Sequence, residues 1–416
     1  MTHAFSPISV AAGFAALILS VPTASAQQTY ERFGFAQTER GRYIAILGDC
    51  AACHTAPGGA PLAGGLRFET PVGAIISSNI TPDRENGIGK MTLKEFDAAM
   101  REGIGQGGKR LYPAMPYPAF SNMTDEDIAD LYAWIMAQQP APAQINSNEL
   151  KFPFDIRTGM IAWNMINFKP DAFKPDPAQS AEWNRGGYIV EGPGHCGACH
   201  SGKTITMGDK SSEHLTGAII ENWVAPNITG DAEAGLGAWE EQDIIAYLKT
   251  GANRFDIASG GMMDVIRHSS RMWTDGDLKA VAVYLKSQPG RSGKPLAAAL
   301  PETDMRMQAG ARIYKDRCSA CHFDNGEGYP GLFPSLAGAG SVNAEEPTSV
   351  LHVVLAGSRA VATPAAPTGP AMPSLGWALS DNDIANVVTY VRNAFGNTAA
   401  PVSTEQVATA RAALQP

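Results

Sequence analysis

The pentapeptide CAACH at residues 50–54 recurs as CGACH at residues 196–200 and as CSACH at residues 318–322. These three copies contain all six cysteines of the 416-residue chain. Because no cysteine is left over, a disulfide framework is not expected. A motif that recurs along a chain indicates a structural unit that recurs with it. The sequence therefore predicts three related units in tandem.

The first two units share further short motifs at matching places. The pairs are RGRY at 40–43 and RGGY at 185–188, NIT at 79–81 and NIT at 227–229, and GIG at 87–89 and GLG at 235–237. All three units also share a closing signal, a hydroxyl residue followed by acids: TDED at 124–127, TDGD at 274–277 and SDND at 380–383. Such a hydroxyl caps a helix, and the acids face the positive end of its dipole. We expect a helix to begin at each of these points.

Apolar residues after each closing signal recur at helical spacing. They are Ile128, Leu131 and Ile135, then Leu278, Val281 and Leu285, and finally Ile384, Val387, Val388 and Val391. An aromatic residue lies ten positions beyond each cap, Trp134, Tyr284 or Tyr390, and we expect it to pack on the helix that carries the pentapeptide. The pattern predicts an all-α fold.

The Cys-x-x-Cys-His pattern is typical of covalent haem attachment. On one helical turn two thiols reach the two vinyl groups of one porphyrin, and the adjacent histidine lies under the iron. A zinc site or a redox dithiol also begins with Cys-x-x-Cys. Zinc would need a second cysteine pair or more histidines in each unit, and a dithiol has no use for a fixed histidine. The sequence therefore predicts three covalent haems, attached through Cys50, Cys53, Cys196, Cys199, Cys318 and Cys321, with His54, His200 and His322 as proximal iron ligands.

The sixth iron ligand of the first unit is predicted to be a methionine. His54 is the only histidine between Gln27 and the end of the first connector, so a second histidine ligand is impossible there. Most methionines after the motif lie in helical patterns, where core packing explains them. Met115 differs, because it lies in the proline-stiffened stretch YPAMPY at 112–117. We expect this loop to hold Met115 over the iron.

Equivalent methionines follow in the other units. Met262 lies 62 residues after His200, as Met115 lies 61 residues after His54. Spacing does not separate Met262 from Met263, and His268 and His214 are weaker alternatives. In the third unit Met372 is the only methionine after His322, and it lies in GPAMP at 369–373. Its competitor His352 lies in an apolar run and is interpreted as a packed histidine. His195, directly before Cys196, is either a haem-edge residue or an ordinary polar residue.

The chain is predicted to be exported. An apolar stretch from Val10 to Val21 precedes Ala24-Ser25-Ala26, a cleavage site typical of a signal peptide, although no Lys or Arg precedes the stretch. The stretch is too short to span a bilayer, and no later apolar run approaches the ~20 residues that a spanning helix needs.

With 32 Lys and Arg against 41 Asp and Glu, the net charge of −9 argues against nucleic acid as a partner.

The composition along the chain suggests these boundaries: signal peptide 1–26, first domain 27–140, arm 141–178, second domain 179–289, linker 290–303, third domain 304–397 and tail 398–416. The arm is rich in proline and aromatic residues and is expected to be extended. Packing between domains is its favoured role, and docking of a partner subunit is the alternative. No phosphate loop, dinucleotide fingerprint or catalytic triad is present, so no catalytic residue is predicted.

The sequence resembles the trihaem cytochrome c subunits of membrane-associated bacterial dehydrogenases that oxidise alcohols, gluconate, fructose, sorbitol, glucose or aldehydes. The resemblance covers nearly the whole mature chain. Its most specific parts are GRY at 41–43, LYPAMPY at 111–117, the two NIT motifs, WNRG at 183–186, and MP at 372–373 with GW at 376–377 and LSD at 379–381.

This resemblance implies three tandem class I-like cytochrome c domains joined by proline- and aromatic-rich connectors, with Met115, Met262 and Met372 as distal ligands. It also implies a separate catalytic subunit of flavin, quinone or molybdenum type, ubiquinone or a terminal oxidase as acceptor, and a periplasmic location at the outer face of the cytoplasmic membrane. The family's membrane attachment lies in the C-terminal region, whereas residues 401–416 here are Ala-rich and only mildly amphipathic.

The alternative function is a self-contained multihaem oxidoreductase, a peroxidase or a sulfur-compound oxidase with one open haem. A distal methionine in every unit argues against it.

Overall fold

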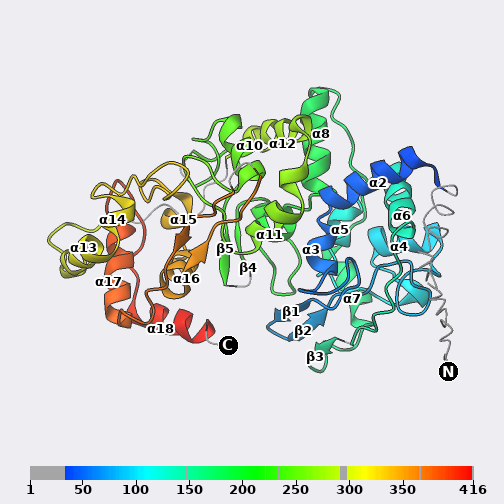
Figure 1. The fold of residues 1–416 in the computed structure, drawn as a ribbon, viewed down its shortest axis with the longest axis horizontal. Coiled ribbons are helices and arrows are strands. Elements are labelled where there is room, and N and C mark those ends of the chain that lie inside the picture. The colour runs from blue at the N-terminus through cyan, green and yellow to red at the C-terminus, as the bar shows by residue number, and fades with distance from the viewer. Residues whose placement is uncertain are drawn as a thin grey trace, which may run out of the picture.

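The computed structural model describes residues 33–146, 148–220, 222–232, 234–290, 298–364 and 367–414. The predicted signal peptide and residues 291–297 of the predicted linker lie outside these ranges. Helices make up most of the regular structure of the described residues, and the three units follow one another along the long axis of the molecule (Figure 1).

Three pairs of crossing helices form the framework. Helix α2 (Phe35–Leu47) packs on α6 (Asp125–Met136), α8 (Ala181–Glu191) on α12 (Asp275–Ser287), and α13 (Met305–Arg317) on α17 (Asp381–Val391). Further helices include α4 (Leu93–Glu102), α5 (Tyr117–Phe120), α10 (Glu241–Thr250), α11 (Gly261–His268), α15 (Gly340–Asn343), α16 (Thr348–Ala356) and α18 (Thr404–Ala413). Short 3₁₀ turns lie at η1 (Gln106–Gly108), η2 (Ser211–Glu213) and η3 (Ser270–Met272).

A glycine lies at each crossing because the helices approach too closely for a side chain. A Cβ atom on Gly41 would lie 1.8 Å from the carbonyl oxygen of Asp130. The corresponding distances are 2.0 Å from Gly186 to the oxygen of Ala280 and 2.2 Å from Gly310 to the oxygen of Asn386. The three pairs therefore use the same kind of contact.

The predicted helix starts are confirmed. Thr124, Thr274 and Ser380 each cap the closing helix of their unit, and each side chain accepts a hydrogen bond from the backbone N–H three residues later. The prediction that Trp134, Tyr284 and Tyr390 pack on the helix that carries the pentapeptide is wrong, because they pack on the helix before it. The Cβ atoms of Trp134, Tyr284 and Tyr390 lie beside the crossing glycines of α2, α8 and α13. The pentapeptides form separate short helices, α3 (Cys50–His54), α9 (Gly197–His200) and α14 (Ser319–His322).

The prediction of an all-α fold misses several short antiparallel strands. Strands β1 (Arg67–Thr70), β2 (Gly73–Ile76) and β3 (Glu149–Leu150) form one sheet, β4 (Ala218–Ile220) pairs with β5 (Trp223–Ala225), and β6 (Ser358–Arg359) pairs with β7 (Ala371–Met372). Each strand has two to four residues. This length is too short for an alternating apolar pattern to show in the sequence.

The prediction of an extended arm over 141–178 is wrong for its centre. Residues Gly159–Asn167 form helix α7, which lies between flanking proline segments. Trp163 on α7 is half-buried; its ring packs against Tyr117 with centroids 6.3 Å apart, and its Nε1 donates to the carbonyl oxygen of Thr206 at 2.7 Å. Trp163 thus packs the arm between the first and second units.

The first two units share one hydrophobic core. A single cluster of buried residues runs from α2 and α6 to α8 and α12, with Leu131, Ile189 and Leu278 among its most buried members. A separate cluster fills the third unit. A small third cluster joins Ala258 and Ile266 of the second unit to Val361 of the third.

Two tyrosines cross-connect the first two units in equivalent ways. Tyr43 on α2 donates to Asp277 Oδ2 at 2.7 Å and accepts from the backbone N–H of Thr274 at 3.0 Å. Tyr188 on α8 donates to Asp127 and accepts from the backbone N–H of Thr124 at 3.2 Å. Each unit therefore helps to cap the closing helix of the other.

The C-terminal helix α18 packs on the third unit. Val407 is fully buried, and Arg411 bonds to the Asp381 carboxylate and to the carbonyl oxygens of Gly376 and Leu379. In the part of the chain that the structure describes, no helix has the length and apolar character that a membrane crossing requires.

Candidate haem sites

Each pentapeptide forms one short helical turn that presents its two cysteines differently. The first cysteine of each motif is half-buried and the second is exposed. Burial raises the pKa of the Cys50 and Cys196 thiols to about 12 and that of Cys318 to about 11. A reactive dithiol needs a lowered pKa. Two neutral thiols on one helical turn fit thioether attachment better than a redox dithiol.

The metal-site alternative also lacks further ligands. Among the described residues, no group of three or more His, Cys, Asp or Glu side chains lies close enough together to hold an ion. A structural zinc ion takes four such ligands. The cysteines and histidine of each motif therefore fit a porphyrin-bound iron rather than a bare ion.

The proximal histidines are oriented by backbone carbonyls. Nδ1 of His54 donates to the carbonyl oxygen of Ser78 at 2.7 Å, Nδ1 of His200 to that of Pro226 at 2.7 Å, and Nδ1 of His322 to that of Pro334 at 3.1 Å. Because a carbonyl only accepts, the proton is on Nδ1, and the Nε2 lone pair is left for a metal. Burial lowers the pKa of all three histidines, which favours the neutral imidazole that a metal needs.

The repeated NIT motif holds two of these carbonyls in place. Ser78 comes directly before Asn79, and Pro226 directly before Asn227. The Asn79 side-chain oxygen accepts from the backbone N–H and the hydroxyl of Thr81 at 2.9 and 2.7 Å. Asn227 and Thr229 repeat the arrangement at 2.8 and 2.7 Å. The motif closes a tight turn, which fixes the direction of the preceding carbonyl.

In the third unit a serine side chain closes the turn that follows the carbonyl partner of His322. Ser335 follows Pro334, and its Oγ accepts from the backbone N–H of Ala337 at 3.2 Å. These carbonyl partners were missed from the sequence, because a backbone acceptor leaves no residue type to recognise. The repeated NIT motif was the available signal.

Met115 lies in the predicted non-helical loop. Its backbone N–H donates to the carbonyl oxygen of Tyr112 at 3.0 Å, and its carbonyl accepts from Tyr117 at 2.7 Å, so the segment is a tight turn. The side chain is half-buried and packs on the same hydrophobic cluster as Cys50. This turn leads into α5 and lies ahead of the closing helix α6 of the first unit.

Met262 and Met263 lie in the first turn of helix α11 and not in a loop. Both are half-buried and pack on the small cluster that joins the second and third units. Gly260 begins this turn at φ +58°, where a Cβ atom would lie 2.6 Å from the Trp223 ring. Of the two weaker alternatives, His268 ends α11, and His214 has its Nε2 2.9 Å from Glu191 Oε1.

Met372 is held by a strand. It pairs with Ser358 in the two-residue ladder of β6 and β7, and Pro373 follows it. The competing His352 lies on α16 and stacks on Trp223, with ring centroids 3.9 Å apart. His352 therefore packs between the second and third units.

The residues directly before the first two motifs face the neighbouring unit. Asp49 and His195 both have positive φ, at 49° and 38°. The His195 ring packs edge-on against Phe120 of the first unit at 5.5 Å. Asp49 Oδ1 is buried without a hydrogen-bond partner among the described residues, and burial, with a smaller effect of Asp264, raises the pKa of Asp49 to about 8.

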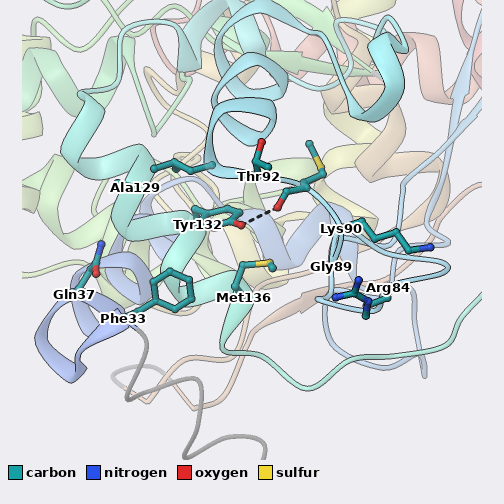
Figure 2. Close-up of a pocket in the computed structure, with 11 residues that line it drawn as sticks. Phe33, Gln37, Arg84, Gly89, Lys90, Thr92, Ala129, Tyr132 and Met136 are labelled. Atoms are coloured by element: carbon teal, nitrogen blue, oxygen red, sulfur yellow. Dashed lines mark hydrogen bonds between the residues drawn. The ribbon is translucent and has the colours of Figure 1, made fainter.

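A surface cavity of about 500 Å³ lies in the first unit (Figure 2). Phe33, Tyr132 and Met136 form its apolar wall, and Arg84 and Lys90 lie at its edge. The Tyr132 hydroxyl donates to the carbonyl oxygen of Met91 at 2.8 Å. None of the predicted haem residues lines this cavity.

Comparisons with known proteins support covalent haem c as the cofactor. The cytochrome c family model matches residues 38–139 and 307–395. The chain is 40% identical over 397 residues to the gluconate 2-dehydrogenase cytochrome c subunit of Pantoea cypripedii, covering 90% of each chain. It is 40% identical over 411 residues to the cytochrome c subunit of the quinone-type alcohol dehydrogenase of Gluconobacter oxydans, covering 94% of this chain and 84% of the relative. A diheme c-type cytochrome of Cereibacter sphaeroides is 34% identical over 286 residues, covering 67% of this chain and 94% of the relative.

Proposed function

The chain belongs to the family of cytochrome c subunits of bacterial dehydrogenases, and from this premise we propose that it carries three covalent haems from which electrons pass to ubiquinone or a terminal oxidase. The electrons come from a separate catalytic dehydrogenase subunit, of flavin, quinone or molybdenum type. The relatives are named as cytochrome subunits of dehydrogenases, so this chain is the electron-transfer subunit and not the catalytic one.

One observation carries the proposal: the same donor set occurs three times. In each unit two thiols lie on one helical turn, and a neutral histidine is tied through Nδ1 to a backbone carbonyl. A c-type haem supplies an iron that takes up and releases one electron. The cysteines would hold the porphyrin edge, and Nε2 of His54, His200 and His322 would bind the iron. The carbonyl bond keeps each imidazole in one tautomer and orientation.

Three tandem cytochrome c domains are proposed at 27–140, 179–289 and 304–397, joined by the arm 141–178 and the linker 290–303. Three helix pairs with the same glycine contact support this division. The diheme relative supports it too, since that protein matches only 67% of this chain. The remaining third is long enough for one more domain of about a hundred residues.

Met115, Met262 and Met372 are proposed as the distal ligands. A thioether favours the ferrous state, which raises the reduction potential, and it closes the iron to small ligands. Each side chain is half-buried and held by a turn, a helix or a strand pair. Such ligation suits an electron carrier and not an enzyme with an open iron.

Two measurements test this function. The intact mass of the exported protein should exceed the mass of its polypeptide by three haems; an excess of two or fewer would contradict the proposal. Met372→Ala should open one haem of the three to carbon monoxide and lower its potential, while His352→Ala should not. If the effects are reversed, the ligand of the third unit is misassigned.

The partner is tested by reduction. The haem-loaded chain alone should not oxidise alcohols or sugars with an artificial acceptor, and its haems should become reduced only when the catalytic subunit and its substrate are added. Turnover by the lone chain would contradict the proposal. We place the protein in the periplasm, at the outer face of the cytoplasmic membrane, which agrees with the predicted signal peptide.

A further inference from the structure

Helix α7 (Gly159–Asn167) is held to the protein by Trp163 and two asparagines and turns apolar side chains towards solvent. Asn164 accepts from the Tyr117 hydroxyl at 2.7 Å, and Asn167 accepts from the Thr206 hydroxyl at 2.9 Å. On the opposite side Met165 is 83% exposed and Ile166 is 74% exposed. A surface helix of a water-soluble domain normally exposes polar side chains on its outer side. This side of α7 is therefore suited to a non-aqueous neighbour.

The apolar side of α7 continues onto adjacent segments. Ahead of the helix, Phe152, Phe154 and Ile156 are exposed, and the Tyr112 hydroxyl bonds to the carbonyl oxygen of Phe154. Beside it, exposed Ile205 flanks Thr206, the residue that accepts from Trp163. We call Phe152–Ile156, the outer side of α7 and Ile205–Met207 the α7 surface. Exposed apolar groups gathered in this way mark an interaction site.

Cations without ion-pair partners surround the α7 surface. Among the described residues, no carboxylate pairs with five neighbouring cations: Lys109, Arg110, Lys151, Arg157 and Lys169. Arg157 instead lies 4.7 Å over the Tyr112 ring. Of the nearby acids, Glu149, Asp171 and Asp209 are paired with Arg67, Lys174 and Lys203, and Asp155 lies exposed within the surface itself, so the five cations outnumber the one remaining acid. The surroundings of this surface are thus cationic in a chain whose net charge is −9.

The C-terminal region does not offer a comparable surface. Helix α18 turns Val407 into the core of the third unit, and Arg411 ties it to Asp381 and to two carbonyls. The resemblance had implied membrane attachment here, but the apolar residues of α18 are used for packing. Among the described residues, eight of the 17 exposed large apolar side chains lie on the α7 surface.

We propose that the α7 surface docks on an anionic phospholipid bilayer. This inference rests on the proposed location at the outer face of the membrane and identifies the surface that makes the contact. Apolar side chains above a ring of Lys and Arg are typical of interfacial membrane binding, because the side chains enter the acyl boundary while the cations lie among the phosphates. Excess positive charge on an acidic protein matches anionic lipid and would not be needed for a purely apolar subunit interface.

The test is sedimentation of the haem-loaded full chain with vesicles of phosphatidylcholine, with and without phosphatidylglycerol. Met165→Glu should weaken binding to anionic vesicles at least about tenfold, because it removes one buried apolar side chain and adds a repelled charge. Met305→Glu is the matched control, since Met305 is also 83% exposed and begins a helix elsewhere. It should bind as the wild type does.

A second variant tests the charges. Lys151→Gln with Lys169→Gln should weaken binding to anionic vesicles by about fivefold per cation removed, with no change on pure phosphatidylcholine. Unchanged binding of Met165→Glu would overturn the proposal, as would an equal loss with Met305→Glu. If Met165→Glu binds vesicles normally but no longer copurifies with the catalytic subunit, the α7 surface is the subunit interface, and the membrane proposal is wrong.

The failure of this proposal is distinguishable from a failure of the proposed function. Reduction of the haems by the catalytic subunit is measured in solution without vesicles, where Met165→Glu should match the wild type. Haems that are not reduced in the wild type would contradict the electron-transfer function, whatever the vesicles show.

Discussion

Replacing the crossing glycine of the third unit tests the helix-pair framework most directly. In Gly310→Ala the new Cβ would lie 2.2 Å from the Asn386 carbonyl oxygen and 2.5 Å from Tyr390 Cβ. Both neighbours are rigid: one is helix backbone, and the other is the first carbon of a side chain. Non-bonded heavy atoms pack favourably at about 3.5 Å, so α13 and α17 must move apart by about 1 Å.

The expected loss of stability follows from the core residues that this movement separates. Tyr314, Ile384 and Val388 are buried in the core of the third unit. Overpacking of this kind costs about 1–3 kcal/mol, and the better helix propensity of alanine returns up to about 1 kcal/mol. We expect Gly310→Ala to lower the free energy of unfolding of the third unit by about 1 kcal/mol. The core of this unit is separate, so the first two units should keep their stability.

Denaturant unfolding of the haem-loaded protein, followed by circular dichroism and haem absorbance, measures this effect. Gly276→Ala is the matched control: it lies in the first turn of α12, and the nearest atom to its Cβ is 3.9 Å away. It should stabilise the protein by up to about 1 kcal/mol. If Gly310→Ala behaves like Gly276→Ala, the close approach of α13 and α17 is refuted.

Two further predictions concern the contact between the first two units. Tyr43→Phe removes the hydroxyl that donates to Asp277 and should destabilise the joint core by about 2 kcal/mol, the usual contribution of a hydrogen bond to a charged group. Tyr188→Phe should have the same effect because it removes the bond to Asp127. An unchanged denaturation midpoint for both variants would contradict the cross-connection. Asp49, whose pKa burial raises from 3.8 to about 8, binds a proton in the folded state that the unfolded chain releases, so its contribution to stability falls as pH rises from about 4 to 8. Asp49→Asn removes this pH dependence, so the free energy of unfolding of the variant should rise relative to that of the wild type by about 1.4 kcal/mol per pH unit between pH 5 and 7. The same difference between variant and wild type at both pH values would contradict the raised pKa of Asp49.

The sequence alone determined the parts of this protein that depend on local chemistry. The cysteines and histidine of each pentapeptide adjoin along the chain, so their spacing predicted the cofactor without knowledge of the fold. The helix starts at Thr124, Thr274 and Ser380 were equally readable, because a cap bonds a backbone group three residues away. The predicted turn around Met115 followed from the fixed φ angles of its flanking prolines.

The tertiary structure decided what depends on distant residues. The repeated NIT motif marked two of the turns, but no residue type identified Ser78, Pro226 and Pro334 as the residues that orient the histidines, since every residue type has a carbonyl. The helical centre of the arm was hidden because proline at both ends dominated the composition. The shared core of the first two units, the Tyr43 and Tyr188 bonds and the outward side of α7 all join segments far apart in sequence. Such contacts depend on how the helices approach one another in space, and spacing along the chain does not record that.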